Sequence, residues 1–152
     1  MFDEELQALA AMVVRDFEAA GKRVATVESC TGGLIGACIT SASGSSSVFD
    51  RGFITYSNEA KGTLVGVDPE VIREHGAVSA QCASQMAIGG LKAADVDAAV
   101  AVTGIAGPGG GTSEKPVGLV FIAVAIREEE GAFVEQFEFG DLGRDQVRTA
   151  TV

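Results

Sequence analysis

Short apolar runs that alternate with helix-patterned segments constrain the fold of this chain more than any other feature of its sequence. Residues 24–28 and 97–103 are compact apolar runs, and residues 48–56 alternate enough to form a strand. Helical patterns lie between these runs, which is the order typical of a parallel sheet covered by helices. We therefore expect an α/β fold with helices on both faces of the sheet.

The helical segments carry start and stop signals. Residues 2–20 form the first predicted helix, which Gly21 ends. Its apolar side chains recur at helical spacing and are Leu6, Leu9, Met12, Val13 and Phe17. Asp68 and Ser79 suit the N-caps of two further helices. A last helix is expected to begin at Arg144.

Two more strands follow a glycine-rich loop at residues 104–116. Residues 117–127 and 132–139 are apolar runs joined by a charged turn, which predicts a hairpin. The first three strands should be parallel, the fourth should run back, and the fifth should again run with the first three. The segments that follow strands one, two, three and five then share one edge of the sheet. Ligands bind outside the carboxyl ends of strands in open α/β sheets.

Composition excludes several classes of function. A length of 152 residues suits one domain, residues 1–152, with one hydrophobic core. The net charge of -10 disfavours binding to nucleic acid and to anionic membranes. The longest apolar stretch, residues 117–126, is too short to span a bilayer. The N-terminus lacks the basic start of a signal peptide, so we expect a cytoplasmic protein.

The cysteine and histidine content argues against metal and disulfide chemistry. Cys30, Cys38 and Cys82 form no CxxC pair, and His75 is the only histidine. An odd number of scattered cysteines does not make a disulfide framework, and a zinc site needs more ligands of these types. We expect no metal and no cofactor.

The segment from Glu28 to Gly33, with the sequence ESCTGG, lies between a predicted strand and a predicted helix. Ser29 is a candidate nucleophile at this turn, and backbone N–H groups at Thr31, Gly32 and Gly33 are candidates to bind an oxyanion or another anion. The alternative is that these residues only cap the helix. Cys30 is a second candidate nucleophile, ranked below Ser29 because no histidine is near it in sequence.

Lys61 lies one helical turn beyond the second strand and is the best candidate for the base that a serine nucleophile needs. A lysine serves as a base when burial or nearby cations lower its pKa. The alternative is an ordinary solvated lysine. Tyr56, at the end of the same strand, is the next candidate base.

The loop that starts at Thr103 and Gly104 carries an unusual number of glycines, Gly107 among them. Such a loop permits close approach of the backbone to a ligand, but a flexible hairpin loop is the alternative. Arg144 and Arg148 lie four residues apart on one face of the last helix. They are able to neutralise a phosphate or carboxylate, or else to pair with nearby aspartates at the surface.

These motifs, in this order, resemble the C-terminal domain of the competence/damage-inducible protein CinA, whose stand-alone relatives are nicotinamide-nucleotide amidases. The resemblance covers residues 5 to 148. The matching blocks are residues 27–33, 44–46, 53–61, 76–79, 86–87, 103–108 and 115–118.

The resemblance implies a three-layer α/β/α sandwich around a mixed, mostly parallel five-stranded sheet with one antiparallel strand. It also implies hydrolysis of the carboxamide of nicotinamide mononucleotide to nicotinate mononucleotide and ammonia, without a cofactor. The family's nucleophile falls on Ser29 and its catalytic lysine on Lys61, while Tyr56 and Thr103 match positions that line that site. The family's Gly-Asp-Arg before the last helix is two residues longer here, ending at Arg144.

Two other functions stay open on the sequence alone. One is hydrolysis of another small amide, and the other is a non-catalytic domain that binds a nucleotide or regulates a partner. Expected partners are a small-molecule nucleotide substrate and further copies of the chain in a homo-oligomer, with a dimer as the first expectation.

Overall fold

A computed structural model describes residues 2–152 and confirms the α/β architecture. The five-stranded sheet has the order β2-β1-β3-β4-β5, with β1 Val24–Glu28, β2 Phe49–Ile54, β3 Ala98–Gly104, β4 Leu119–Ile126 and β5 Phe133–Glu138. β1 pairs in parallel with β2 and β3, whereas β4 pairs antiparallel with both β3 and β5. β4 is thus the one antiparallel strand, as expected.

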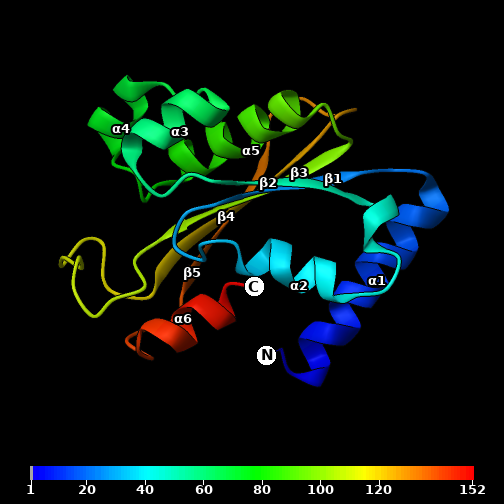
Figure 1. Cartoon of the computed structure of the whole chain (residues 1–152). Helices are drawn as coiled ribbons and strands as arrows, with labels where there is room; N and C mark the ends of the chain where they lie inside the picture. The colour runs from blue at the N-terminus through cyan, green and yellow to red at the C-terminus, as the bar shows by residue number, and fades with distance from the viewer. Residues whose placement is uncertain (1) are drawn as a thin grey trace.

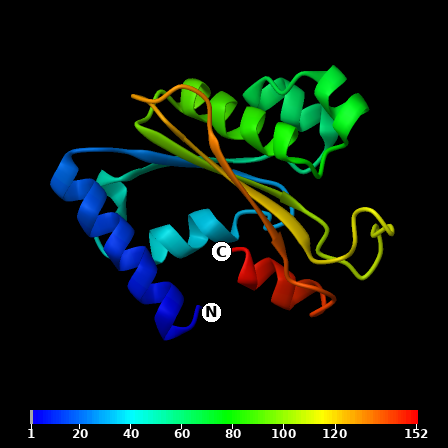
Figure 2. The ribbon, with the colours of Figure 1, turned by 180° about the vertical axis from the view of Figure 1, so that it is seen from behind.

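Helices cover both faces of this sheet (Figure 1). α3 Asn58–Val65, α4 Pro69–His75 and α5 Ala80–Ala94 lie on one face. α1 Glu4–Ala20, α2 Leu34–Ser41 and α6 Arg144–Ala150 lie on the other, and a short 3-10 helix, η1 Ser45–Ser47, precedes β2. Figure 2 shows the same three layers from behind, with the long loop between β3 and β4 again beside α6.

Alternation along β1 divides the core into two parts. Val27 packs toward α5 with the small side chains Ala83 and Ala87, while Val24 packs toward α1 and α2 on the opposite face. α5 lies very close to the sheet at Gly90, where a Cβ atom would overlap the side chain of Val27. Small residues on α5 therefore set the spacing between this helix and β1.

Side chains cap several helices where the sequence predicts it. Asp68 accepts a hydrogen bond from the backbone N–H of Glu70, and Ser79 accepts one from Cys82. Gly21 adopts a left-handed conformation at the end of α1, with φ of 64°. Each of these contacts satisfies backbone groups that a helix end leaves unpaired.

The predicted apolar face of α1 is partly wrong. Leu9 and Met12 are 48% and 46% exposed, whereas Ala10 and Val14 are buried. α1 packs mainly on α2. The buried stripe is therefore rotated toward the smaller Ala10, which allows the two helices to approach closely.

Candidate active site

The segments after four strands meet at one edge of the sheet and form a pocket of about 220 Å³. This is the edge at which the carboxyl ends of β1, β2, β3 and β5 lie, as expected from the strand directions. The residues that line it are Ser29, Cys30, Tyr56, Asn58, Lys61, Ala77, Val78, Thr103, Gly104, Ala106 and Arg144.

Ser29 follows β1 directly and is 8% exposed. Its backbone N–H donates to the carbonyl oxygen of Val102 on β3, over 3.2 Å, so the turn starts from a fixed point on the sheet. The N-cap of α2 is Gly33, with no side-chain capping bond. The hydroxyl of Ser29 is therefore not a helix cap, and it faces Lys61 instead.

Lys61 is 1% exposed, which excludes the alternative of a solvated surface lysine. Its Nζ lies 3.1 Å from Ser29 Oγ, 2.8 Å from the carbonyl oxygen of Thr55 and 3.4 Å from that of Tyr56. A neutral amine that donates two N–H groups to the two carbonyls has its lone pair left for the Ser29 hydroxyl proton. Ser29 and Lys61 thus have the separation of a nucleophile and its base.

Burial lowers the pKa of the Lys61 amine below its ordinary value, because desolvation disfavours the charged form. No salt bridge to Lys61 exists in the described part of the chain. The amine consequently lacks the carboxylate partner that usually keeps a buried lysine protonated.

Glu28 anchors the turn that carries Ser29. Its carboxylate is fully buried and accepts four hydrogen bonds. The donors are the Thr31 hydroxyl at 2.7 Å and the backbone N–H groups of Gly33 at 2.9 Å, Ile35 at 3.1 Å and Gly36 at 2.8 Å. Negative charge is stabilised at a helix N-terminus, so the start of α2 and this carboxylate fix each other.

Two of the three predicted anion-binding donors of the turn, the N–H groups of Gly32 and Gly33, are already engaged within it. The N–H of Gly33 donates to Glu28, and that of Gly32 donates to the carbonyl oxygen of Ser29. The Thr31 side chain is likewise bonded to Glu28. These three residues shape the turn, and none of them lines the pocket.

Tyr56 and Arg144 meet at the mouth of the pocket. One Nη of Arg144 donates to the Tyr56 hydroxyl over 3.0 Å and the other to the carbonyl oxygen of Gly107 over 2.8 Å. Tyr56 is 61% exposed, and its carbonyl, not its hydroxyl, contacts Lys61. The Arg144 guanidinium keeps further N–H donors for a ligand.

The end of β3 and the loop that follows it are held in place by several contacts. Thr103 donates from its hydroxyl to the carbonyl oxygen of Ala77, 2.9 Å away, and Gly104 lines the pocket. A Cβ atom at Gly104 would come within 2.7 Å of the Val120 side chain. Lys115 Nζ donates to the carbonyl oxygen of His75 at the end of α4. The glycine-rich segment is thus tied to its neighbours on both sides of the pocket.

Cys30 does not have the properties of a nucleophile. Its side chain is buried in the core between the sheet and α2, and burial raises the pKa of its thiol to about 11. A thiol that stays protonated at neutral pH is a poor nucleophile. All three cysteines are buried and unpaired.

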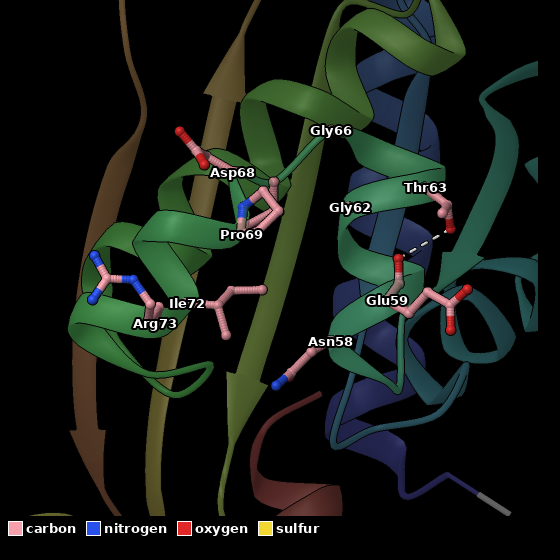
Figure 3. Close-up of a pocket in the computed structure, with 10 residues that line it drawn as sticks. Asn58, Glu59, Gly62, Thr63, Gly66, Asp68, Pro69, Ile72 and Arg73 are labelled. Carbon is pink, nitrogen blue, oxygen red and sulfur yellow. Dashed lines mark hydrogen bonds between the residues drawn. The ribbon is translucent and has the colours of Figure 1, made fainter.

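A larger hollow of about 880 Å³ lies between α3 and α4 and shares Asn58 with the pocket that holds Ser29 and Lys61. Figure 3 shows Asn58 extending from α3 toward this hollow and Ile72 facing it from α4, while the charged ends of Glu59 and Arg73 point away. It contains no pairing of a nucleophile with a base. The smaller pocket is therefore the candidate active site, and the hollow adjoins it at Asn58.

Sequence reasoning assigned no role at this site to Asn58, Ala77 or Val78, and it placed Arg148 at a ligand or at nearby aspartates instead of at the turn. Ala77 and Val78 enter the pocket from the segment before α5, and Asn58 lies at its mouth. Arg148 donates to backbone carbonyls of the Ser29 turn, at Cys30 and Thr31. Glu28, the acidic residue before Ser29, was the one sequence signal for the residue that anchors the turn, because a carboxylate at the end of a buried strand seldom lacks hydrogen-bond partners.

Two further features are absent from the part of the chain that the structure describes. Within residues 2–152, no group of three or more histidine, cysteine, aspartate or glutamate side chains is placed to hold a metal ion. No helix in the same range has the length and apolar character that crossing a membrane requires.

Known proteins resemble this chain over nearly its whole length. It is 50% identical over 148 residues to the nicotinamide-nucleotide amidohydrolase PncC of Escherichia coli K12, covering 97% of this chain and 88% of that protein. It is 50% identical to a CinA-like protein of Geobacter sp. M21, of which it covers 34%.

Solved structures agree with these sequence matches. A competence/damage-inducible protein CihA of Agrobacterium tumefaciens superposes with a TM-score of 0.97 at 48% identity, over 99% of this chain and 91% of that one. A CinA superfamily protein of E. coli superposes with a TM-score of 0.90 at 27% identity, over 99% and 87%. The profile of the CinA C-terminal domain matches residues 6–152, and the chain belongs to the CinA C-terminal domain family.

Proposed function

We propose that this chain is a nicotinamide-nucleotide amidase that hydrolyses the carboxamide of nicotinamide mononucleotide with Ser29 as nucleophile and Lys61 as base. The observation that carries the proposal is the buried contact of 3.1 Å between Lys61 Nζ and Ser29 Oγ. The 50% identity to the E. coli amidohydrolase PncC supports the choice of substrate.

The first half of the reaction releases ammonia. Neutral Lys61 accepts the hydroxyl proton of Ser29 while Oγ attacks the carboxamide carbon, and the carbonyl oxygen becomes an oxyanion. When the tetrahedral intermediate collapses, Lys61 returns that proton to the departing nitrogen, which leaves as ammonia. An ester between Ser29 and the nicotinate carbonyl remains.

The second half consumes water. Lys61 accepts a proton from the attacking water, the ester carbon becomes tetrahedral again, and Ser29 leaves as the proton returns to its Oγ. Nicotinate mononucleotide is released and both side chains regain their starting states. The lowered pKa of Lys61 makes the neutral amine available for both proton transfers.

The shape of the pocket suggests how a nucleotide is held. A volume of about 220 Å³ is below the range of about 300–1,000 Å³ typical of pockets that enclose a whole ligand. We place the carboxamide-bearing ring inside it and the ribose phosphate at the mouth. Arg144 supplies positive charge there, whereas Glu59 borders the hollow on the other side of Asn58, so the phosphate lies toward Arg144.

The alternative of a non-catalytic binding domain leaves the buried Lys61 without a task. Desolvating an amine is costly, and a binding domain gains nothing from placing one against a serine hydroxyl. Hydrolysis of another small amide keeps the same mechanism. Comparing ammonia release from nicotinamide, nicotinamide riboside and the mononucleotide separates that alternative from the proposal.

The test is ammonia release from nicotinamide mononucleotide by the wild type, Ser29→Ala and Cys30→Ala. We expect Ser29→Ala to lose at least about 10³-fold in kcat while it melts like the wild type, as loss of a nucleophile does in serine hydrolases. Cys30→Ala should keep most of the activity. Substantial activity in Ser29→Ala, or its loss in Cys30→Ala alone, refutes the assignment of the nucleophile.

We also propose that the reaction takes place in the reducing cytoplasm, which the three unpaired cysteines favour. A homo-oligomer stays a prediction. Sedimentation analysis at micromolar concentration gives the number of copies, and a monomer throughout would refute it.

A further inference from the structure

We propose that Arg148 is a positioning residue for amide hydrolysis. By holding the peptide groups that follow Ser29, it leaves the N–H groups of Cys30 and Thr31 free to stabilise the oxyanion. This inference rests on the amidase function proposed above, and it assigns to Arg148 a part in the chemistry, whereas phosphate binding is left to Arg144.

Arg148 bridges the last helix and the nucleophile turn. Its Nε donates to the carbonyl oxygen of Cys30 over 3.1 Å, and one Nη donates to that of Thr31 over 3.0 Å. A Cβ atom at Gly32 would lie 3.6 Å from the same Nη, so the guanidinium packs directly on the turn. α6 is held on the core by Val147, which is fully buried.

The backbone donors of the turn can be accounted for one by one. From Ser29 to Gly36, six N–H groups have acceptors. Ser29 donates to Val102, Gly32 to Ser29 and Leu34 to Thr31, while Gly33, Ile35 and Gly36 donate to Glu28. In this segment of the described chain, only the N–H groups of Cys30 and Thr31 have no oxygen acceptor, and both lie near the Cys30 sulfur, where they act to lower the pKa of the thiol. Buried N–H groups without partners are rare in proteins, and at an active site they are candidates to bind a developing negative charge.

Arg148 fixes the direction of both free donors. In a trans peptide the N–H points opposite to the C=O of the same group, so the bond to the Cys30 carbonyl sets the direction of the Thr31 N–H. The bond to the Thr31 carbonyl orients the Gly32 N–H, which donates to the Ser29 carbonyl. That last bond sets the direction of the Cys30 N–H. One guanidinium therefore orients three consecutive peptide groups after the nucleophile.

The other arginine of α6 differs in its surroundings. Arg144 lines the pocket and reaches Tyr56, whereas Arg148 is absent from the pocket lining and is bound to carbonyls of the turn. A residue that meets the phosphate should affect binding, while one that orients oxyanion donors should affect the chemical step. This difference gives the experiment its discriminating measurement.

The experiment compares Arg148→Ala and Arg148→Lys with the wild type and with Arg144→Ala. Steady-state ammonia release is measured on nicotinamide mononucleotide and on nicotinamide riboside, and a thermal melt locates each variant's unfolding. We expect Arg148→Ala to lower kcat by about 10- to 100-fold, the scale of a misplaced catalytic group, with KM changed by less than about threefold. The loss should be equal on the two substrates. Arg144→Ala should instead raise KM, and only on the mononucleotide.

Free guanidinium separates positioning from a purely structural role. Added at millimolar concentration, it should restore part of kcat in Arg148→Ala without raising the melting temperature. Should Arg148→Ala unfold at the assay temperature, Arg148→Lys is the variant to interpret. It keeps the charge, but a lysine cannot present the planar pair of donors that the two carbonyls receive.

Each remaining outcome has one meaning. A loss confined to KM for the mononucleotide makes Arg148 a phosphate contact and overturns the inference. An unchanged kcat, or a loss that follows the unfolded fraction and resists guanidinium, overturns it as well. A wild type that releases no ammonia from either substrate refutes the proposed function itself, a result that the variants are not needed to recognise.

Discussion

Replacing Glu28 by glutamine tests whether the anchor of the nucleophile turn is as important as its four hydrogen bonds suggest. The amide keeps the shape of the carboxylate but has a single acceptor oxygen. Glu28 Oε2 accepts three donors and Oε1 accepts one, from Gly36 N–H. The amide oxygen should take the place of Oε2, where it accepts the three donors. The NH₂ group then takes the place of Oε1 and faces the N–H of Gly36, which loses its acceptor.

The cost follows from these contacts. One buried hydrogen bond to a charged group is lost, at about 1.5–3 kcal/mol. The three that remain become neutral, and charge-assisted bonds are roughly twice as strong as neutral ones. Relief from desolvating the carboxylate offsets part of this loss. We expect a net decrease of about 2–5 kcal/mol in the free energy of unfolding, or about 5–20 °C in melting temperature for a domain of this size.

The assay is a thermal melt together with kcat, measured at a temperature at which the variant is folded. Glu59→Gln is the matched control, because Glu59 is exposed in the first turn of α3 and its side chain makes no hydrogen bond within residues 2–152. It should change stability by no more than about 0.5 kcal/mol. If Glu28→Gln melts within about 2 °C of the wild type, the contacts of Glu28 do not hold the turn and the reasoning is wrong.

Four further predictions concern Lys61, metals and packing. The kcat/KM of the wild type should rise with pH through an apparent pKa below that of a free lysine, and Lys61→Arg should abolish activity because arginine cannot accept a proton; activity in Lys61→Arg would make Lys61 only a positive charge. Because the pKa of Lys61 is lower in the folded chain, the unfolded chain binds a proton at this amine more readily. Lys61 should therefore make the free energy of unfolding rise with pH between its folded-state pKa and about 10.4. Urea titrations at several pH values, with Lys61→Met as the comparison, test this. Exhaustive dialysis against EDTA should leave activity unchanged, and recovery with added zinc after a loss would contradict a metal-free reaction. Gly89→Ala should destabilise the domain by at least about 2 kcal/mol, because its Cβ would overlap the carbonyl oxygen of Val65, whereas Gly62→Ala, with only ordinary contacts, should not; equal urea midpoints would show that α3 gives way.

The order of strands and helices was enough to predict the edge of the sheet at which the site lies. Parallel strands joined by helices place their carboxyl ends together, so Ser29, Lys61 and Thr103 meet although they are far apart in sequence. The predicted bounds of β1 are the observed ones, and those of the other four strands differ by one or two residues at each end. β2 stops at Ile54 instead of Tyr56 because the next carbonyls turn toward Lys61.

The sequence pattern could not predict which acceptor each donor at the site would bind. Gly32 and Gly33 have the composition of an anion-binding turn, yet the buried carboxylate of Glu28 and the Ser29 carbonyl already accept their N–H groups. The position of Arg148 in the sequence is equally consistent with a phosphate contact, and only its two carbonyl partners in the structure show that it binds the turn. The spacing of residues in the sequence predicts which helix or strand carries a side chain. Which of several nearby acceptors its donors bind depends on how the folded chain packs.

The hydrogen bonds between Arg148 and the turn after Ser29 make activity depend on contacts between residues far apart in the sequence, which form slowly during folding. They join groups 117 and 118 positions apart, and contacts of such separation are costly in loop-closure entropy. A refolding chain in which β1, β2 and β3 are assembled but α6 is not yet docked would already hold Ser29 beside Lys61. It lacks the guanidinium that orients the turn. During refolding, ammonia release should therefore lag behind the recovery of secondary structure, so that turnover reports when the last helix has docked.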